Sequence, residues 1–237
     1  MKIQNFVGVI IPAAGSGSRM GGVYKPLEML CGKEMIAYSL ETFESSPEVS
    51  FVVISAREDK IDELWQLCRK YSFTKVKAIV KGGKDRQASV ENAFVCGLFD
   101  DINVDFVAIH DAARPLFDVN MANKVFSMAK EKGNAVCASR VRDTVKRTDD
   151  EGIVSDGVER ENLWLIQTPQ VFKKQMYKSA LETAKENGVV ATDDSSLVYA
   201  NGEEVYLCDT PSCNIKVTYP EDVFLAQAII EKRGNEK

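Results

Sequence analysis

The chain has 237 residues, 45% hydrophobic and 27% charged, which is the composition of a folded protein with a substantial core. Its net charge of -5 argues against nonspecific binding of nucleic acid. The apolar run near the N-terminus is too short to cross a membrane, and the six cysteines form no C-x-x-C pair. We therefore expect a cytoplasmic protein that binds neither nucleic acid nor membranes.

Short β-branched runs alternate with segments of helical periodicity along the first 140 residues. The expected strands are residues 6–11, 51–55, 76–80, 106–109 and 135–139. Apolar faces at helical spacing predict helices within residues 35–43, 61–68, 90–98 and 121–128. This alternation predicts an α/β fold, with a mostly parallel twisted sheet covered by helices on both faces.

The alternation stops after Val141, where the polar segment "RDTVKRTDDEGIVSDGVEREN" begins. Its turn-rich composition predicts a β-arm over about residues 140–163 that projects from the sheet. Regular packing resumes at Leu163, and a last helix is expected to begin near Pro220. We expect residues 1–237 to form a single domain with the arm as a subdomain.

The first expected strand leads into the glycine-rich loop "PAAGSGSRMGGVYKP". Glycines let backbone N–H groups approach an anion closely, and Arg19 and Lys25 add two cations. Met20 replaces the third glycine of a dinucleotide fingerprint, and the Gly-Lys-Ser/Thr of a Walker loop is absent. The loop therefore suits a triphosphate whose α-phosphorus is attacked, the alternative being a plain turn with a surface arginine.

Two further strand ends carry candidate site residues. After the third strand comes "KGGKDRQASVENAF", in which two glycines again allow close backbone approach. After the fourth strand comes "HDAARP", in which Asp111 can reach a ligand or a magnesium ion at the rim of the sheet. A capping role is the alternative for Asp111, and the single histidine, His110, is expected in the core.

Seven motifs in order, from about Val9 to Ala228, resemble those of the 2-C-methyl-D-erythritol 4-phosphate cytidylyltransferase family. They are "PAAGSGSRMG", "GGKDRQASVENA", "AIHDAARP", "RDTVKR", "LWLIQTPQVF", "TDDSSLV" and "NIKVTYPEDV". The resemblance implies a three-layer, Rossmann-like nucleotidyltransferase fold. It also implies transfer of CMP from CTP to 2-C-methyl-D-erythritol 4-phosphate in non-mevalonate isoprenoid synthesis. Mg2+ would bridge the triphosphate, and pyrophosphate would leave after in-line attack.

The resemblance also implies the site residues, motif by motif. The implied catalytic residues are Arg19, Lys25, Arg160 and Lys216. The implied CTP site comprises Pro12, Ala13, Ala14, Gly15, Gly17, Gly82, Gly83, Lys84, Ser89, Asp111 and Ala112, with Asp111 also holding the metal. The acceptor phosphate would be bound by Arg114, Thr144, Arg160, Thr192 and Lys216. In the family the arm clasps a second subunit, which implies a homodimer whose acceptor sites draw residues from both chains.

Part of this set has support from the residues themselves. Arg160 is a cation in the otherwise acidic stretch "DGVERENLW", and Lys216 lies in the alternating strand "NIKVT", where it could also be an ordinary outward-facing lysine. Asp193 and Asp194 are typical of a helix start and are expected to be structural.

The sequence departs from the family pattern at Pro26, which follows the loop lysine, and at Lys84, where aspartate is frequent. Both departures bear on the acceptor, so a cytidylyltransferase for another polyol phosphate, such as ribitol 5-phosphate, stays open. A sugar-1-phosphate nucleotidyltransferase is disfavoured by "RDTVKR" and "TPQVF". A nucleotide-binding protein without activity would be expected to lose Arg19, Lys25 or Asp111, all of which are present.

Overall fold

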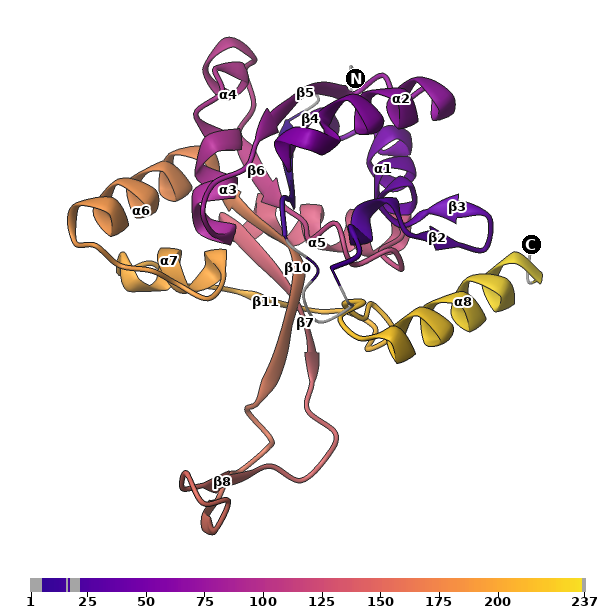
Figure 1. Ribbon diagram of the computed structural model, residues 1–237. Coiled ribbons are helices and arrows are strands. Elements are labelled where there is room, and N and C mark those ends of the chain that lie inside the picture. The colour runs from indigo at the N-terminus through magenta and orange to yellow at the C-terminus, as the bar shows by residue number, and fades with distance from the viewer. Residues whose placement is uncertain (1–5, 16, 18–21, 236–237) are drawn as a thin grey trace.

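A seven-stranded mixed sheet forms the centre of the computed structural model, which describes residues 6–15, 17 and 22–235 (Figure 1). The strands, in spatial order, are β11 (Leu207–Asp209), β7 (Asn134–Arg140), β10 (Trp164–Lys173), β6 (Phe106–Ile109), β1 (Val7–Ala13), β4 (Val49–Ala56) and β5 (Val76–Lys81). Neighbours are parallel except where β10 pairs with β6 and β7. The five strands expected from the sequence are confirmed.

The helices follow the expected order with one correction. The structure contains α1 (Met35–Ser45), α2 (Ile61–Tyr71), α3 (Arg86–Phe94), α4 (Leu98–Asp101), α5 (Val119–Lys132), α6 (Lys174–Glu186), α7 (Asp194–Ala200) and α8 (Pro220–Asn235), with 3-10 turns η2 (Lys25–Leu27) and η3 (Glu58–Lys60). The expectation of one helix over 90–98 was wrong. Gly97 has φ 97°, which a continuing helix does not allow, so the chain breaks between α3 and α4.

Helices cover both faces of the sheet because successive strand residues point to opposite sides. In β1, Val9 and Ile11 pack into a core with residues of α1, α2 and α5. Ile10 points the other way, into a core with residues of α3, α6 and α7. This arrangement confirms the expected three-layer α/β fold.

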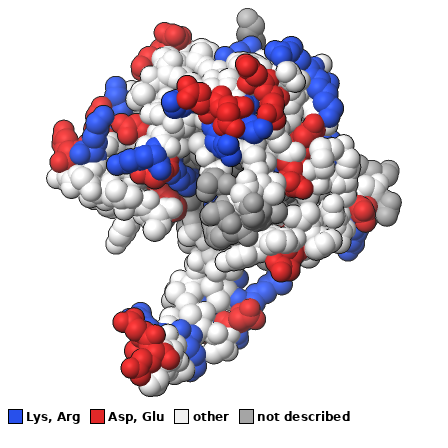
Figure 2. Space-filling model, in the orientation of Figure 1, with Lys and Arg blue, Asp and Glu red and all other residues white. Residues whose placement is uncertain are grey.

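Strands β7 and β10 continue into a long arm that projects away from the sheet (Figure 1). Within it, β8 (Lys146–Thr148) pairs antiparallel with β9 (Val154–Gly157), which confirms the predicted β-arm. Acidic side chains gather at its tip (Figure 2), where Asp149, Asp150 and Glu151 follow one another.

The C-terminal helix α8 lies beside a small hairpin of β2 (Met29–Leu30) and β3 (Lys33–Glu34). A third apolar cluster joins Leu30, Met35 and Leu116 to Val217 and Ala226. This cluster holds the 213–218 segment, which carries Lys216, against the end of the sheet. Among the described helices, none combines the length and the apolar character that crossing a membrane requires.

Candidate active site

A cavity of about 500 Å³ opens at the carboxyl ends of the parallel strands, where ligands bind in open α/β sheets. Its walls come from stretches that lie far apart in the sequence. They are Pro12, Ala13, Ala14, Gly15, Gly17, Lys25, Pro26, Gly83, Lys84, Asp85, Arg86, Ser89, Asp111, Ala112, Ala113 and Lys216. Most residues that the sequence assigned to a CTP site therefore share one cavity, together with Lys25 and Lys216.

The glycine loop after β1 depends on the absence of a side chain at Gly17. This residue has φ 67°, and a Cβ added to it would lie 1.9 Å from the carbonyl oxygen of Val23. A Cβ at Gly15 would meet no atom within 4 Å among the described residues other than its chain neighbours, and Gly15 lines the cavity. Arg19 lies outside the described residues, and its predicted role stays a prediction.

Lys25 stands at the end of this loop and begins η2. Its Nζ donates a hydrogen bond to the carbonyl oxygen of Val217, at 3.2 Å. Pro26 is buried near the start of the 3-10 turn, where a fixed φ and a missing N–H are tolerated. The Lys-Pro departure from the family pattern is therefore accommodated by a local turn that directs Lys25 toward the segment carrying Lys216.

The Gly82–Gly83 turn is held by Ser89, the buried residue in the first turn of α3. The Ser89 Oγ accepts from the N–H of Gly83 at 3.0 Å and donates to the carbonyl of Asp85 at 2.7 Å. The N–H of Gly82 donates to the carbonyl of Ala56 at 2.8 Å. Both glycine N–H groups have partners inside the protein. A nucleotide base bound here would therefore have to contact other groups of this turn. Gly82 itself does not line the cavity in the described structure.

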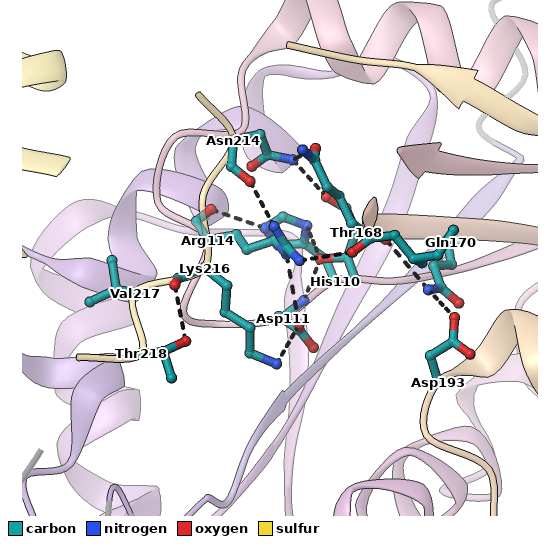
Figure 3. Close-up of polar contacts among 12 residues, drawn as sticks. His110, Asp111, Arg114, Thr168, Gln170, Asp193, Asn214, Lys216, Val217 and Thr218 are labelled. Carbon is teal, nitrogen blue, oxygen red and sulfur yellow. Dashed lines mark hydrogen bonds and ion pairs between the residues drawn. The ribbon is translucent and has the colours of Figure 1, made fainter. Parts of the chain in front are cut away.

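Asp111 follows β6 and is surrounded by cations. The Lys216 Nζ lies 2.8 Å from its Oδ2, the Arg86 Nε lies 3.2 Å from its Oδ1, and Arg114 Nε lies 3.8 Å from Oδ2 (Figure 3 shows the contacts with Lys216 and Arg114). Burial acts to raise the pKa of the Asp111 carboxyl, but Arg86 and Lys216 outweigh burial and hold this pKa well below its usual range. The carboxylate is therefore ionised at neutral pH.

The side chain of His110 is buried, as the sequence predicted, and it supports the backbone beside Asp111. Ser39 Oγ donates to the Arg114 carbonyl at 3.1 Å, so the His110 Nε2–H donates to Ser39 Oγ, also at 3.1 Å. His110 Nδ1 then accepts from the hydroxyl of Thr168 at 3.2 Å, and Thr168 Oγ1 accepts from the Asp111 N–H at 2.9 Å (Figure 3). Burial lowers the pKa of His110 to about 3, so the imidazole is neutral at pH 7.

Arg114 is buried and turned toward backbone carbonyls. It donates to the carbonyl of Asn214 at 2.7 Å and to that of Ile166 at 3.3 Å. It does not line the cavity in the described part of the chain. Its expected contact with the acceptor stays a prediction, and the contacts observed here tie the end of β6 to β10 and to the 213–218 segment.

A network of buried polar side chains on β10 was not predicted from the sequence. Gln167 and Thr168 lie where the pairing of β10 with β7 is interrupted, between Ile166 and Gln170. Gln167 Oε1 accepts from Asn214 Nδ2 at 3.0 Å, and Gln170 Nε2 donates to Asp193 Oδ2 at 2.8 Å. The signal was available in "LIQTPQVF", since three polar residues in an otherwise apolar strand need buried partners.

Besides Arg114, three residues expected at the acceptor phosphate do not line the cavity of their own chain within the described structure. Thr144 and Arg160 lie on the arm, and Thr192 is exposed just before α7. Arg160 Nη1 donates to the carbonyl of Arg142 at 2.7 Å and faces a separate hollow at the base of the arm. The fold therefore keeps the arm residues apart from Lys25 and Asp111.

The cavity combines a glycine loop that ends at Lys25 with the ionised Asp111 and with Lys216. These features are typical of a nucleotide-binding α/β protein of the transferase type. The comparisons identify it more closely. Residues 7–232 match the IspD family, described as 2-C-methyl-D-erythritol 4-phosphate cytidylyltransferase. The chain belongs to this family of cytidylyltransferases.

Individual relatives agree over nearly the full length. The chain is 36% identical over 227 residues to the 2-C-methyl-D-erythritol 4-phosphate cytidylyltransferase of Clostridium acetobutylicum, covering 95% of this chain and 97% of the relative. It is 39% identical over 227 residues to the protein of that name from Desulforamulus reducens, covering 95% and 96%. The crystal structure of 4-diphosphocytidyl-2C-methyl-D-erythritol synthase from Anaerococcus prevotii superposes with a TM-score of 0.81 at 27% identity, covering 95% and 98% of the two chains.

Proposed function

We propose that this chain transfers CMP from CTP to 2-C-methyl-D-erythritol 4-phosphate, forming 4-diphosphocytidyl-2-C-methyl-D-erythritol and pyrophosphate. Membership of the cytidylyltransferase family supports the reaction type and both substrates. One observation supports the site assignment above all: Lys25, Asp111 and Lys216 line the same cavity as the glycine loop. A phosphoryl transfer needs little more than positioning and charge stabilisation, and these residues supply both.

The reaction needs no covalent enzyme intermediate. An oxygen of the acceptor phosphate forms a bond to the α-phosphorus of CTP, and the bond from that phosphorus to the bridging oxygen breaks. Pyrophosphate leaves with the electron pair. Lys25, with Arg19 from the same loop, stabilises the negative charge on the reacting phosphorus and the leaving group. Lys216 holds the acceptor phosphate beside them.

The residues present fit a magnesium ion that is held mainly by the nucleotide. The described residues contain no group of three or more His, Cys, Asp or Glu side chains placed to bind a metal. Asp111, ionised and on the cavity wall, is the carboxylate that would hold Mg2+ together with triphosphate oxygens. When bound, the ion would neutralise phosphate charge. Calorimetry of CTP binding with and without Mg2+, for the wild type and Asp111→Asn, tests this assignment independently of turnover.

We also propose a homodimer in which the arm serves the cavity of the second copy. Arg160 and Thr144 lie on the arm, while Lys25 and Lys216 lie at the cavity. Exposed apolar side chains along the arm, Ile153 at 60%, Val154 at 58% and Leu165 at 58%, support a partner that covers them.

We further propose a cytoplasmic location, as expected from the sequence, because all six cysteines are free thiols.

The experiment that tests the function is pyrophosphate release from CTP and Mg2+, with 2-C-methyl-D-erythritol 4-phosphate and ribitol 5-phosphate offered in parallel. We expect release with the first acceptor and a much slower reaction with the second. UTP in place of CTP controls for base selectivity. Preference for ribitol 5-phosphate would keep the nucleotide half of the proposal and replace the acceptor, and no release with either would overturn it.

A further inference from the structure

The first turn of α3 contacts a distant segment, residues 189–194, that leads into α7. The side-chain amide of Gln87 bonds the backbone of this segment on both sides of Val190. Its Nε2 donates to the carbonyl of Val189 at 3.2 Å, and its Oε1 accepts from the N–H of Ala191 at 3.0 Å. One side chain therefore fixes two successive peptide groups directly before Thr192.

The neighbouring residue, Arg86, joins the same segment to the cavity. Its guanidinium lies between two carboxylates, with Nη1 2.7 Å from Asp194 Oδ2 and Nε 3.2 Å from Asp111 Oδ1. Asp194 is 1% exposed, and its Oδ1 accepts from the hydroxyl of Tyr177 at 2.6 Å. Removing the arginine would leave a buried carboxylate without its counter-charge, so the bridge is costly to break.

The far end of the segment is also held. Gln170 Nε2 donates to Asp193 Oδ2 at 2.8 Å, and Gln170 Oε1 accepts from the N–H of Ser195 at 2.7 Å (Figure 3 shows the contact between Gln170 and Asp193). Asp193 caps α7 by accepting from the N–H of Ser196. Thr192 thus lies between two anchored stretches, with its own side chain exposed.

We propose that Gln87 and Arg86 are positioning residues that hold the 189–194 segment against the nucleotide side of the cavity and thereby set the affinity for the acceptor phosphate. This inference rests on the proposed function, in which Thr192 binds that phosphate. The first turn of α3 holds Gly83 through Ser89, and it holds the 189–194 segment through Gln87. The two substrates are therefore placed relative to each other by one helix start.

The test uses Gln87→Ala, since Gln87 does not line the described cavity and its loss leaves the Asp111 ion pairs in place. Losing two hydrogen bonds to the segment is expected to raise the KM for the acceptor about 3- to 30-fold. The KM for CTP and kcat should stay within about twofold, because the turn around Gly83 is retained. Glu91→Gln is the matched control, because Glu91 contacts Lys185 from the same helix without reaching the segment.

A second readout follows the segment directly. Hydrogen exchange of the backbone amides of residues 190–193 should be faster in Gln87→Ala than in the wild type or Glu91→Gln. An equal rise in both KM values, or unchanged exchange, would overturn the proposal. If the wild type releases no pyrophosphate with either acceptor, the proposed function fails, and the exchange comparison then decides alone whether Gln87 holds the segment.

Discussion

The ammonium of Lys216 lies 2.8 Å from Oδ2 of Asp111, so the cation proposed for the acceptor phosphate is ion-paired with the carboxylate proposed for the metal. In the proposed reaction, Lys216 would contact a phosphate as well as, or in place of, this carboxylate when the substrates bind. The two roles are therefore linked by one ion pair.

Lys216→Ala is expected to lower kcat/KM for the acceptor about 100- to 1000-fold, because the cation that holds the attacking phosphate is removed. Binding of Mg2+ and CTP, measured by calorimetry, should be retained, since Asp111 keeps Arg86 and loses a competing cation. Lys81→Ala is the control, because Lys81 is exposed and pairs with Glu58. A parallel loss of CTP binding would contradict the assignment of Lys216 to the acceptor.

Lys25→Ala is expected to lower kcat about 100- to 1000-fold with little change in thermal stability. Lys25 is half-buried, and its Nζ donates to the carbonyl of Val217 at the cavity. Turnover and melting temperature of the purified variant are the measurements. Arg19→Ala should behave in the same way on the sequence argument, and near-normal turnover in both variants would rule out the loop cations as catalytic.

Alanine substitutions at Gly15 and Gly83 are expected to have different effects, one on CTP affinity and the other on stability. Gly15→Ala should keep the melting temperature and lose CTP affinity, because its Cβ would meet no non-adjacent atom of the described residues within 4 Å and would occupy space on the cavity wall. Gly83→Ala should lower the melting temperature, because its Cβ would lie 2.4 Å from the Cβ of Ala88. Calorimetry and thermal unfolding distinguish the two. Unaltered CTP affinity in Gly15→Ala would exclude the loop from the nucleotide site.

Mixing two inactive variants tests whether the arm serves a second copy. A dimer of one Lys25→Ala chain and one Arg160→Ala chain has one complete site if Arg160 acts on the partner, and none if it acts on its own chain. Random mixing should therefore restore roughly a quarter of wild-type activity. Each variant alone is the control, and the absence of any recovery in a mixture shown to exchange subunits would place Arg160 in its own chain.

The buried histidine predicts how stability depends on pH. Burial lowers the pKa of His110 from 6.5 to about 3, so the unfolded chain takes up a proton below pH 6.5 that the folded chain does not bind. This contribution to stability is present above pH 6.5 and is lost as the pH falls toward 3. Between pH 6.5 and 5 the wild type should lose between about 1 and 2 kcal/mol more than His110→Gln. Denaturant unfolding at both pH values measures the difference, and equal losses would contradict a buried neutral imidazole.

The amino-acid sequence was sufficient to predict the parallel core of the sheet and most of the cavity. The strand that ends before Asp111 is a continuous apolar run, and the strand before Gly82 is apolar except for Lys77 and Lys81. Residues that follow parallel strands meet at one edge of the sheet whatever the loops do. The glycine loop was also recognisable from the sequence, because glycine is the residue that favours a positive φ, and Gly17 has such a φ in the structure.

Only the tertiary structure decided which side chains act on one another across the molecule. The antiparallel course of β10 brings Thr168 beside His110, and the first turn of α3 brings Arg86 between Asp111 and Asp194. The cations around Asp111 keep it ionised, although it is only 7% exposed. Such contacts join residues far apart in the chain, and no periodicity or spacing in the sequence encodes a distance between them. Local backbone preference and strand burial are properties of short stretches, whereas charge pairing depends on where the packed core places each stretch.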